Sequence, residues 1–418
     1  VASVTAARQV LMVVLVAGGA VAASTGILVS QAIGRDERGL ARHITTQALI
    51  VFCLLVMALL MPIGWYATPA LLGLLTKGDA KVMALGVPYM QIVVISLLPT
   101  LATFAAMGAL RGAGDTKTPL TLTFWTNLLT AGTTYALIFG IAALGIPAMG
   151  VVGAAWGNLL SRTVVLVAAY WLLASGRLTL RLEAPRRWKP DWPLLWRMTR
   201  LGTPHAASSI LLNVWGLAVI GILYGTHDGR AAAAAYGLSM LLRNFGTWVT
   251  WGFAEATMAM VGQNYGARKL RRAAETGWAA ARVAATYLLP VSILIAASAH
   301  WLLGLMFKDD PARKAEILMI GSRFLWSQVV ALPVLGMGMS LEGALRGTGD
   351  TRAPLLINVC SLYCIGIPSS YFLARVWGSD GVWAGMALGL VARGLAGWVM
   401  WRWTVRRWAQ RGVGRRVA

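Results

Sequence analysis

Long hydrophobic runs dominate the chain from one end to the other. Counting runs near the ~20 residues that a helix needs to cross a bilayer gives eleven. They lie at 5–33, 44–66, 80–110, 117–142, 149–175, 200–226, 231–264, 276–306, 313–345, 352–375 and 380–404. Several exceed what a bilayer requires, so we expect tilted, kinked or projecting helices. The longest connection, 176–199, is too short for a separate soluble domain. The pattern therefore predicts one all-α polytopic membrane protein.

The charged residues lie mostly between these runs, and their distribution predicts the orientation of the chain. Only 12% of the 418 residues are charged, yet the formal net charge is +22. Assigning the connections alternately to the two sides of the membrane puts 24 Lys and Arg residues on one side and 7 on the other. Basic residues accumulate in cytoplasmic loops, so the first side, which includes 176–200, is predicted to be cytoplasmic. No nucleic-acid-binding module or aromatic-basic groove is visible, so we predict no nucleic-acid partner.

The sequence also contains an internal repeat. Residues 108–120 (GALRGAGDTKTPL) and 343–355 (GALRGTGDTRAPL) are identical at 10 of 13 positions, at an offset of 235. Two further pairs recur at offsets of 232 and 231: VSQAIG at 29–34 with VGQNYG at 261–266, and 150–162 with 381–393. Six crossings separate the two GALRG copies, so both copies face the same side. The two repeats are therefore parallel, related by an axis along the membrane normal.

This repeat predicts two helical lobes, residues 1–185 and 186–418. The second copy has two runs before Gln263, whereas the first has only one before Gln31. We therefore expect that the opening helix of the first copy is missing from this sequence. Parallel repeats suit a transporter, because rocking one lobe against the other gives alternating access to a central cleft.

The repeated GALRG-x-GDT motif has a complete structural interpretation. The two glycines after Arg111, and those after Arg346, can end a helix, and each arginine complements exposed carbonyls there. Asp115 and Asp350 can cap the helix that follows. The motif thus predicts a tight cytoplasmic turn between two long helices. The alternative is a gating ion pair among these four charged residues.

The two LRG-x-GDT copies, six helices apart, resemble the multidrug and toxic compound extrusion (MATE) family. VSQAIG, VGQNYGA and GIP at 366–368 are similar to it as well. The resemblance covers residues 1 to about 404 and begins at the family's second helix. It implies a family pattern of two six-helix lobes, with helices 2–6 in residues 1–185 and helices 7–12 in residues 186–418.

The resemblance also implies a function. A family member would be a secondary active antiporter, not an enzyme, that exports cationic or amphipathic drugs and toxins in exchange for Na⁺ or H⁺. It would act as a monomer in the bacterial inner membrane, with both termini of the full-length protein cytoplasmic. The three cysteines and four histidines match no metal-site spacing, so we predict no metal and no cofactor beyond the coupling ion.

Ionisable residues inside membrane runs are functional candidates, because burying them costs several kcal/mol. Of the fifteen acids, only Glu255 lies well inside a run, about 12 Å before Gln263. We take Glu255 as the ion-coupling candidate, with Arg243 as a relay or ion-pair partner. The alternatives are a purely structural pair with Arg243, Arg282 or Arg323, and a pore-edge residue with neither role. Glu342, nearer the cytoplasmic end, is expected to be solvated or paired.

The sequence departs from the family at its usual coupling acids. Asn127 keeps the Asn of an N-x-x-x-x-x-L-D pattern, but Thr134 stands where the Asp would be. Asn213 occupies a place where some members carry Glu. We predict that these three residues line the substrate cleft. Either Glu255 or an acid on the missing helix provides the coupling, or the coupling is altered.

Two other functions remain open from the sequence alone. One is a flippase for lipid-linked glycans, which would need more cationic groups in its cleft to meet pyrophosphate. The other is an inactive membrane fragment or scaffold. The sequence does not identify the substrate or the ion.

Overall fold

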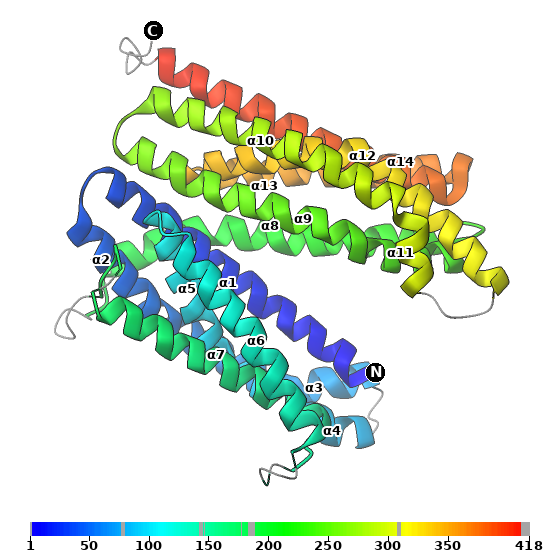
Figure 1. Cartoon of the computed structure of the whole chain (residues 1–418), viewed down its shortest axis with the longest axis horizontal. Coiled ribbons are helices and arrows are strands. Elements are labelled where there is room, and N and C mark those ends of the chain that lie inside the picture. Colours follow the sequence, from blue (N-terminus) through cyan, green and yellow to red (C-terminus); the bar gives the residue numbers. More distant parts are fainter. Residues whose placement is uncertain are drawn as a thin grey trace. The chain divides into compact units, whose positions relative to one another are not determined.

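The structure, a computed structural model, is helical almost throughout the part of the chain that it describes. That part comprises residues 2–76, 80–141, 145, 147–176, 178–182, 189–306 and 311–410. The chain divides into two compact units, residues 1–206 and 207–418 (Figure 1), and each unit has its own hydrophobic core. The predicted all-α fold is confirmed, whereas the lobe boundary at residue 185 stays a prediction.

In the described residues of unit 1, seven α-helices and one π-helical segment precede α8. They are α1 (Ala2–Gly34), α2 (Arg38–Thr46), η1 (Gln47–Phe52), α3 (Cys53–Thr76), α4 (Ala80–Ile95), α5 (Leu97–Gly112), α6 (Lys117–Phe139) and α7 (Gly150–Ala174). α4 and α5 follow one another with a break at Ser96, three residues before Pro99, whose ring cannot donate a helical hydrogen bond. α1 packs along α5, and α6 packs along α7 (Figure 1).

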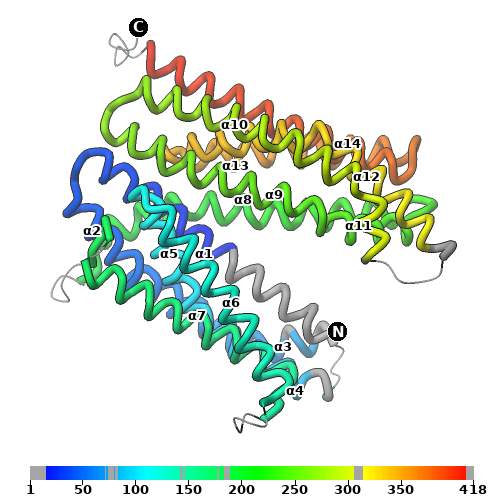
Figure 2. Tube along the Cα trace, in the orientation of Figure 1, coloured from blue at the N-terminus to red at the C-terminus, as the bar shows by residue number. Residues whose placement is uncertain are grey.

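Unit 2 begins within α8 (Trp192–Tyr224) and holds the remaining helices. These are α9 (Gly229–Gly266), α10 (Leu270–Ala297), α11 (Ala299–Met306), α12 (Pro311–Gly347), α13 (Arg352–Asn358), η4 (Val359–Gly366) and α14 (Ile367–Trp408). Gly378 has a φ of 57° and interrupts α14, so its two parts are separate helices. α12 packs against α9, α10 and α14, and Figure 2 traces their paths.

The eleven predicted runs each coincide with helical structure. Eight segments of the described chain are long and apolar enough to cross a membrane, and one of them, Arg352–Trp408, contains the interruption at Gly378. The helices α6 and α9 fall outside this set because they are more polar, although they have 23 and 38 residues and pack within their units. The chain is therefore a multi-pass membrane protein.

The internal repeat appears as the same helix crossing in each unit. A Cβ added at Gly108 of α5 would lie 2.3 Å from the carbonyl oxygen of Ala22 in α1. A Cβ added at Gly343 of α12 would lie 2.2 Å from the carbonyl oxygen of Ala254 in α9. Gly343 lies 235 residues after Gly108, and Ala254 lies 232 residues after Ala22. These are two of the offsets found between the sequence repeats, 235 and 232. Only glycine lets the backbones approach so closely, as in small-xxx-small packing of membrane helices.

Gly343→Ala is expected to lower the thermal unfolding midpoint of the purified protein, because the added methyl group must push α9 and α12 apart. Overpacking of this kind typically costs about 1–3 kcal/mol. Gly237→Ala on α9 is the matched control, since a Cβ there meets nothing within 4 Å. Thermal unfolding in one detergent compares the two. Equal midpoints for both variants would show that the crossing tolerates a side chain.

Candidate functional site

The aspartate of each repeated motif caps the next helix. Asp115 Oδ1 accepts a hydrogen bond from the backbone N–H of Thr118 at 3.0 Å. In the second copy, Asp350 Oδ1 accepts one from the backbone N–H of Ala353, also at 3.0 Å. These bonds satisfy amide groups that have no partner within the helix. The cap predicted from the motif is confirmed in both copies.

The two glycines of the motif have different roles, and here the sequence-based prediction is wrong in part. The second glycine makes the turn, with a φ of 89° at Gly114 and 93° at Gly349. The first glycine remains helical at Gly112 and at Gly347, where an added Cβ would meet a backbone carbonyl of the neighbouring helix at 2.6 and 2.5 Å. The first glycine is thus required for packing, and only the second ends the helix.

The motif arginines differ in burial. Arg346 is only 7% exposed, and its Nε has no hydrogen-bond partner. Arg111 is half-buried. Asp115 and Asp350 already serve as caps. The gating ion pair among these four residues therefore stays a prediction.

The two ion-coupling candidates lie far apart on one helix. Glu255 is half-buried, and Arg243 is 7% exposed; both belong to α9, which is continuous from Gly229 to Gly266. Twelve residues separate them, or about 18 Å along the axis. That distance is too long for a direct ion pair, so of the two roles predicted for Arg243 only a relay remains open.

The most buried ion pair of the described residues joins Glu342 to Arg393. Both carboxylate oxygens accept from the guanidinium, at 2.8 Å from Nε and 2.9 Å from Nη2. Glu342 is 1% exposed and Arg393 is 5% exposed. We expected Glu342 to be solvated or paired, and the structure shows it paired, in a buried, bidentate ion pair. Glu255 is therefore not the only acid deep inside a helix of unit 2.

Glu255 and Glu342 lie at the same level of the parallel pair formed by α9 and α12. The carbonyl of Ala254, one residue before Glu255, faces Gly343, one residue after Glu342. The charge of Glu342 is neutralised by Arg393, whereas Glu255 retains partial exposure. Of the two acids, Glu255 is the more exposed.

The three predicted cleft residues occupy the middle of long helices. Asn127 on α6 and Asn213 on α8 are exposed, and Asn213 Nδ2 donates to the carbonyl of Ser209 at 2.8 Å. A polar side chain exposed at mid-helix is costly against lipid, which favours a water-filled space. Thr134 is half-buried and faces Gly157 of α7 instead. Asn127 and Thr134 belong to unit 1 and Asn213 belongs to unit 2, so their common cleft stays a prediction.

The arginines inside the predicted runs have varied surroundings. Arg162 Nε donates to Asn158 Oδ1, and Arg323 Nη1 donates to Asp380 Oδ2 at 2.9 Å. Arg282 is exposed on α10. The side chain of Arg8 lies outside the described residues. Arg243 has no ion pair or side-chain hydrogen bond among the described residues.

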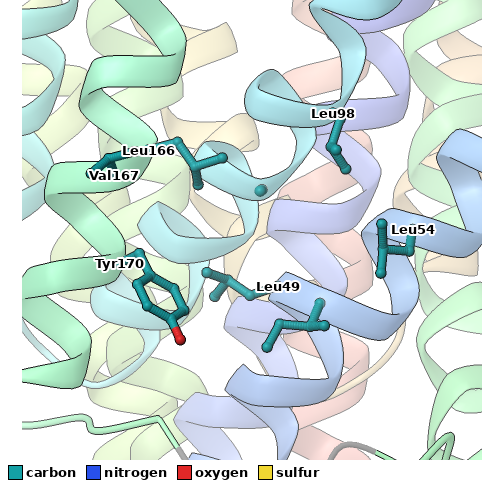
Figure 3. A pocket seen from close by; sticks show the side chains of 8 residues that line it. Leu49, Leu54, Leu98, Leu166, Val167 and Tyr170 are labelled. Carbon is teal, nitrogen blue, oxygen red and sulfur yellow. The ribbon is translucent and has the colours of Figure 1, made fainter. Parts of the chain in front are cut away.

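One pocket of about 310 Å³ lies in unit 1 (Figure 3). Its lining is apolar apart from one phenol: Leu49, Ile50, Leu54, Leu98, Ala102, Leu166, Val167 and Tyr170. Leu54, Val167 and Tyr170 are exposed, so the pocket opens outward from the unit. It suits an acyl chain or the apolar part of an amphipathic molecule, and it contains none of the predicted site residues.

The described residues contain no group of three His, Cys, Asp or Glu side chains that could hold a metal ion. The arrangement consists instead of transmembrane helices, a repeated capped turn, and a few buried charges. The MatE family model matches residues 1–136 and 204–372 of this chain. The chain belongs to the MatE family. MatE proteins are membrane transporters, so this protein is a transporter and not an enzyme.

Curated relatives support the MatE assignment over nearly the whole chain. A probable multidrug resistance protein NorM from Rhizobium meliloti (strain 1021) is 28% identical over 400 residues, which is 94% of this chain and 84% of the relative. A probable NorM protein from Thermotoga maritima is 26% identical and covers 89% of this chain and 78% of the relative.

Solved structures agree with the fold of this MatE protein. The crystal structure of a MATE point mutant superposes with a TM-score of 0.89 at 19% identity, covering 98% of this chain and 90% of that chain. An outward-facing multidrug resistance MATE family transporter of the MOP superfamily gives a TM-score of 0.87 at 20% identity, over 98% and 88%. The resemblance seen in the repeated motif is thereby confirmed.

Proposed function

We propose that this protein is a secondary active antiporter that exports cationic or amphipathic small molecules in exchange for Na⁺ or H⁺. The observation that carries the proposal is MatE membership, together with curated relatives named multidrug resistance proteins. The exposed Asn127 and Asn213 at mid-helix support a cleft that contacts a polar or charged substrate. The bacterial sources of these relatives favour the inner membrane. We further propose that the protein acts as a monomer, with the termini of the full-length protein in the cytoplasm.

Glu255 is our candidate for the group that couples transport to the ion. It lies about 12 Å, or eight residues, before Gln263 at the predicted cytoplasmic end of α9. A half-buried carboxylate can take up a proton or bind Na⁺ together with nearby carbonyls and hydroxyls. The other deep acid of unit 2, Glu342, already has a counter-charge in Arg393. Glu255 is also more exposed than Glu342, and this difference in exposure supports Glu255 as the exchanging group.

The arginines support an antiporter over a glycan flippase. A flippase site would need several available cations for pyrophosphate. Among the intramembrane arginines with described side chains, Arg162, Arg323 and Arg393 have side-chain partners within their own units. Arg282 is exposed on α10. Only Arg243 of this described set is both buried and without a side-chain partner, and one cation is a weak match to pyrophosphate.

The proposal predicts that efflux depends on an ion gradient. The full-length protein in proteoliposomes is expected to release trapped ethidium, an organic cation, faster when an inward Na⁺ or H⁺ gradient is imposed. Coupling free energies of about 1–3 kcal/mol correspond to a change of about 5- to 150-fold. Ionophores that collapse the gradient should remove the stimulation, and protein-free liposomes provide the baseline. If ethidium is released at the same rate with and without the gradients, the antiporter proposal is contradicted. If no ethidium is released at all, the result favours the inactive scaffold.

A further inference from the structure

Several buried polar atoms of unit 2 have no hydrogen-bond partner, among them four on α9, α12 and α14. These four atoms are Tyr236 Oη, Arg243 Nε, Gln328 Oε1 and Trp383 Nε1. The side chains are deeply buried: their residues are 3%, 7%, 1% and 1% exposed. Most buried polar groups in proteins find a partner, so these unpartnered groups require an explanation.

Three aromatic rings join the helices that carry these groups. Tyr236 of α9 stacks on Trp383 of α14, with ring centroids 5.8 Å apart and an interplanar angle of 16°. Phe324 of α12 meets both rings edge-on, at 5.5 Å from Tyr236 and 4.9 Å from Trp383. The phenol and the indole N–H therefore lie on neighbouring rings at the point where α9, α12 and α14 meet.

The register of α9 against α12 brings Arg243 and Gln328 to the same level. Ser239 Oγ donates to the carbonyl of Gly321 at 3.3 Å. Further along, a Cβ added at Gly246 would lie 3.5 Å from Leu332 Cδ1. Arg243 lies between Ser239 and Gly246 on α9.

Gln328 lies between Gly321 and Leu332 on α12, and α9 and α12 run parallel. Gln328 is one turn beyond Phe324, and Arg243 is two turns beyond Tyr236. Arg243 and Tyr236 are also close enough to interact electrostatically. All four groups thus belong to one region of unit 2.

The chemistry of this group favours a negatively charged ligand. A guanidinium stays protonated in proteins and has only donors, an indole N–H only donates, and a phenol can donate. A buried charge without a counter-charge costs several kcal/mol. Among the described residues, no carboxylate pairs with Arg243, although Arg323 and Arg393 on the neighbouring helices each have one. Arg243 is 7% exposed, so the rest of the protein leaves a small part of it uncovered.

We propose that unit 2 holds a binding site for a monoanion, with the Arg243 guanidinium as its counter-charge and Tyr236 and Trp383 as neutral donors. Gln328 lies at the level of the arginine on α12, and its Oε1 accepts no hydrogen bond. The anion is either chloride from solution or the carboxylate of an organic substrate. The site does not depend on the proposed ion exchange, because binding can be measured without transport.

The first test measures stability against anion concentration. The purified full-length protein is titrated with sodium chloride replacing sodium gluconate, at constant Na⁺ and ionic strength, and the thermal unfolding midpoint is recorded. Gluconate is the reference because its long hydroxylated chain does not fit an apolar interior. We expect a saturable rise of the midpoint with chloride, since a ligand that binds only the folded state stabilises it. In crystals soaked in bromide, an anomalous peak is expected beside the Arg243 guanidinium.

Two variants and a control assign the effect to this site. Arg243→Gln removes the cation and should weaken the apparent anion affinity by at least about 30-fold, as expected when one partner of a buried charge pair is lost. Gln328→Glu instead supplies a carboxylate beside Arg243. It should abolish the anion response without lowering the midpoint, and it keeps the test available if Arg243→Gln does not fold. Arg282→Gln, an exposed arginine on α10, should respond like the wild type.

A benzoate titration identifies the source of the anion. A response to benzoate that is lost in Gln328→Glu assigns the site to organic carboxylates, and a response to chloride alone assigns it to the halide. Three results overturn the proposal. They are no response of the wild-type midpoint to either anion, a full response in Gln328→Glu, and a bromide peak elsewhere with none at Arg243. These outcomes leave the efflux experiment unaffected, so the two proposals can fail separately.

Discussion

Replacing Glu342 with methionine is expected to destabilise unit 2 by about 3–5 kcal/mol, because it leaves the Arg393 guanidinium buried without its counter-charge. Both residues are at least 95% buried, and the pair is bidentate. Thermal unfolding in nanodiscs measures the loss as a lower midpoint. The control is Glu275→Gln, whose partner Arg271 and whose own side chain are exposed. An exposed pair contributes only about 0–1 kcal/mol.

The internal repeat explains the choice of methionine. Met107 occupies the position of Glu342 in the first copy, and Arg162 occupies that of Arg393. There Arg162 donates a hydrogen bond to Asn158, and no acid of the described residues pairs with it. The first copy thus has a methionine at the position of Glu342 and an amide as the partner of the arginine.

A double substitution separates packing from charge. Glu342→Met with Arg393→Met should recover most of the lost stability, since replacing both members of a buried pair by apolar residues is often neutral. The double-mutant cycle then gives the coupling between the two side chains. If Glu342→Met unfolds at the temperature of Glu275→Gln, the pair contributes nothing measurable and the expectation fails.

The hydrophobic pattern and the repeat predicted the fold because each is a local or periodic property of the sequence. The runs marked the helices, and the spacing of the GALRG copies indicated two similar units. The caps by Asp115 and Asp350 were predictable because cap and helix start lie within three residues. The π-helical segments at 47–52 and 359–366 were not predicted, because they continue an apolar run without any marker residue.

Contacts between distant helices were not predictable in the same way. The Glu342–Arg393 pair joins residues 51 positions apart, and its formation depends on how α12 rotates against α14. The sequence showed both charges inside or near apolar runs but offered no means of choosing partners among six arginines. The same holds for Gly112 and Gly347, whose packing role follows from the approach of a second helix. The direct pairing of Glu255 with Arg243 failed for a simpler reason, since their spacing along one helix already excluded it.

Replacing Glu255 with glutamine is expected to reduce gradient-stimulated efflux by about 5- to 150-fold, the range that corresponds to a coupling free energy of about 1–3 kcal/mol. Glutamine keeps the size of the side chain but can neither carry the charge that attracts Na⁺ nor release a proton. The residue is half-buried on α9, beside the close crossing with α12. The prediction rests on the proposed antiport. Ethidium release from proteoliposomes under imposed Na⁺ and H⁺ gradients measures it.

Two controls show whether Glu255 couples the ion or only supports the structure. Glu255→Asp retains the charge and should retain part of the gradient response, whereas Glu275→Gln on the exposed face of α10 should behave like the wild type. Ethidium counterflow without any gradient should persist in Glu255→Gln, because substrate binding does not require the coupling ion to move. The gradient whose effect disappears identifies the ion. A Glu255→Gln protein that responds to both gradients as the wild type does would place coupling on another residue.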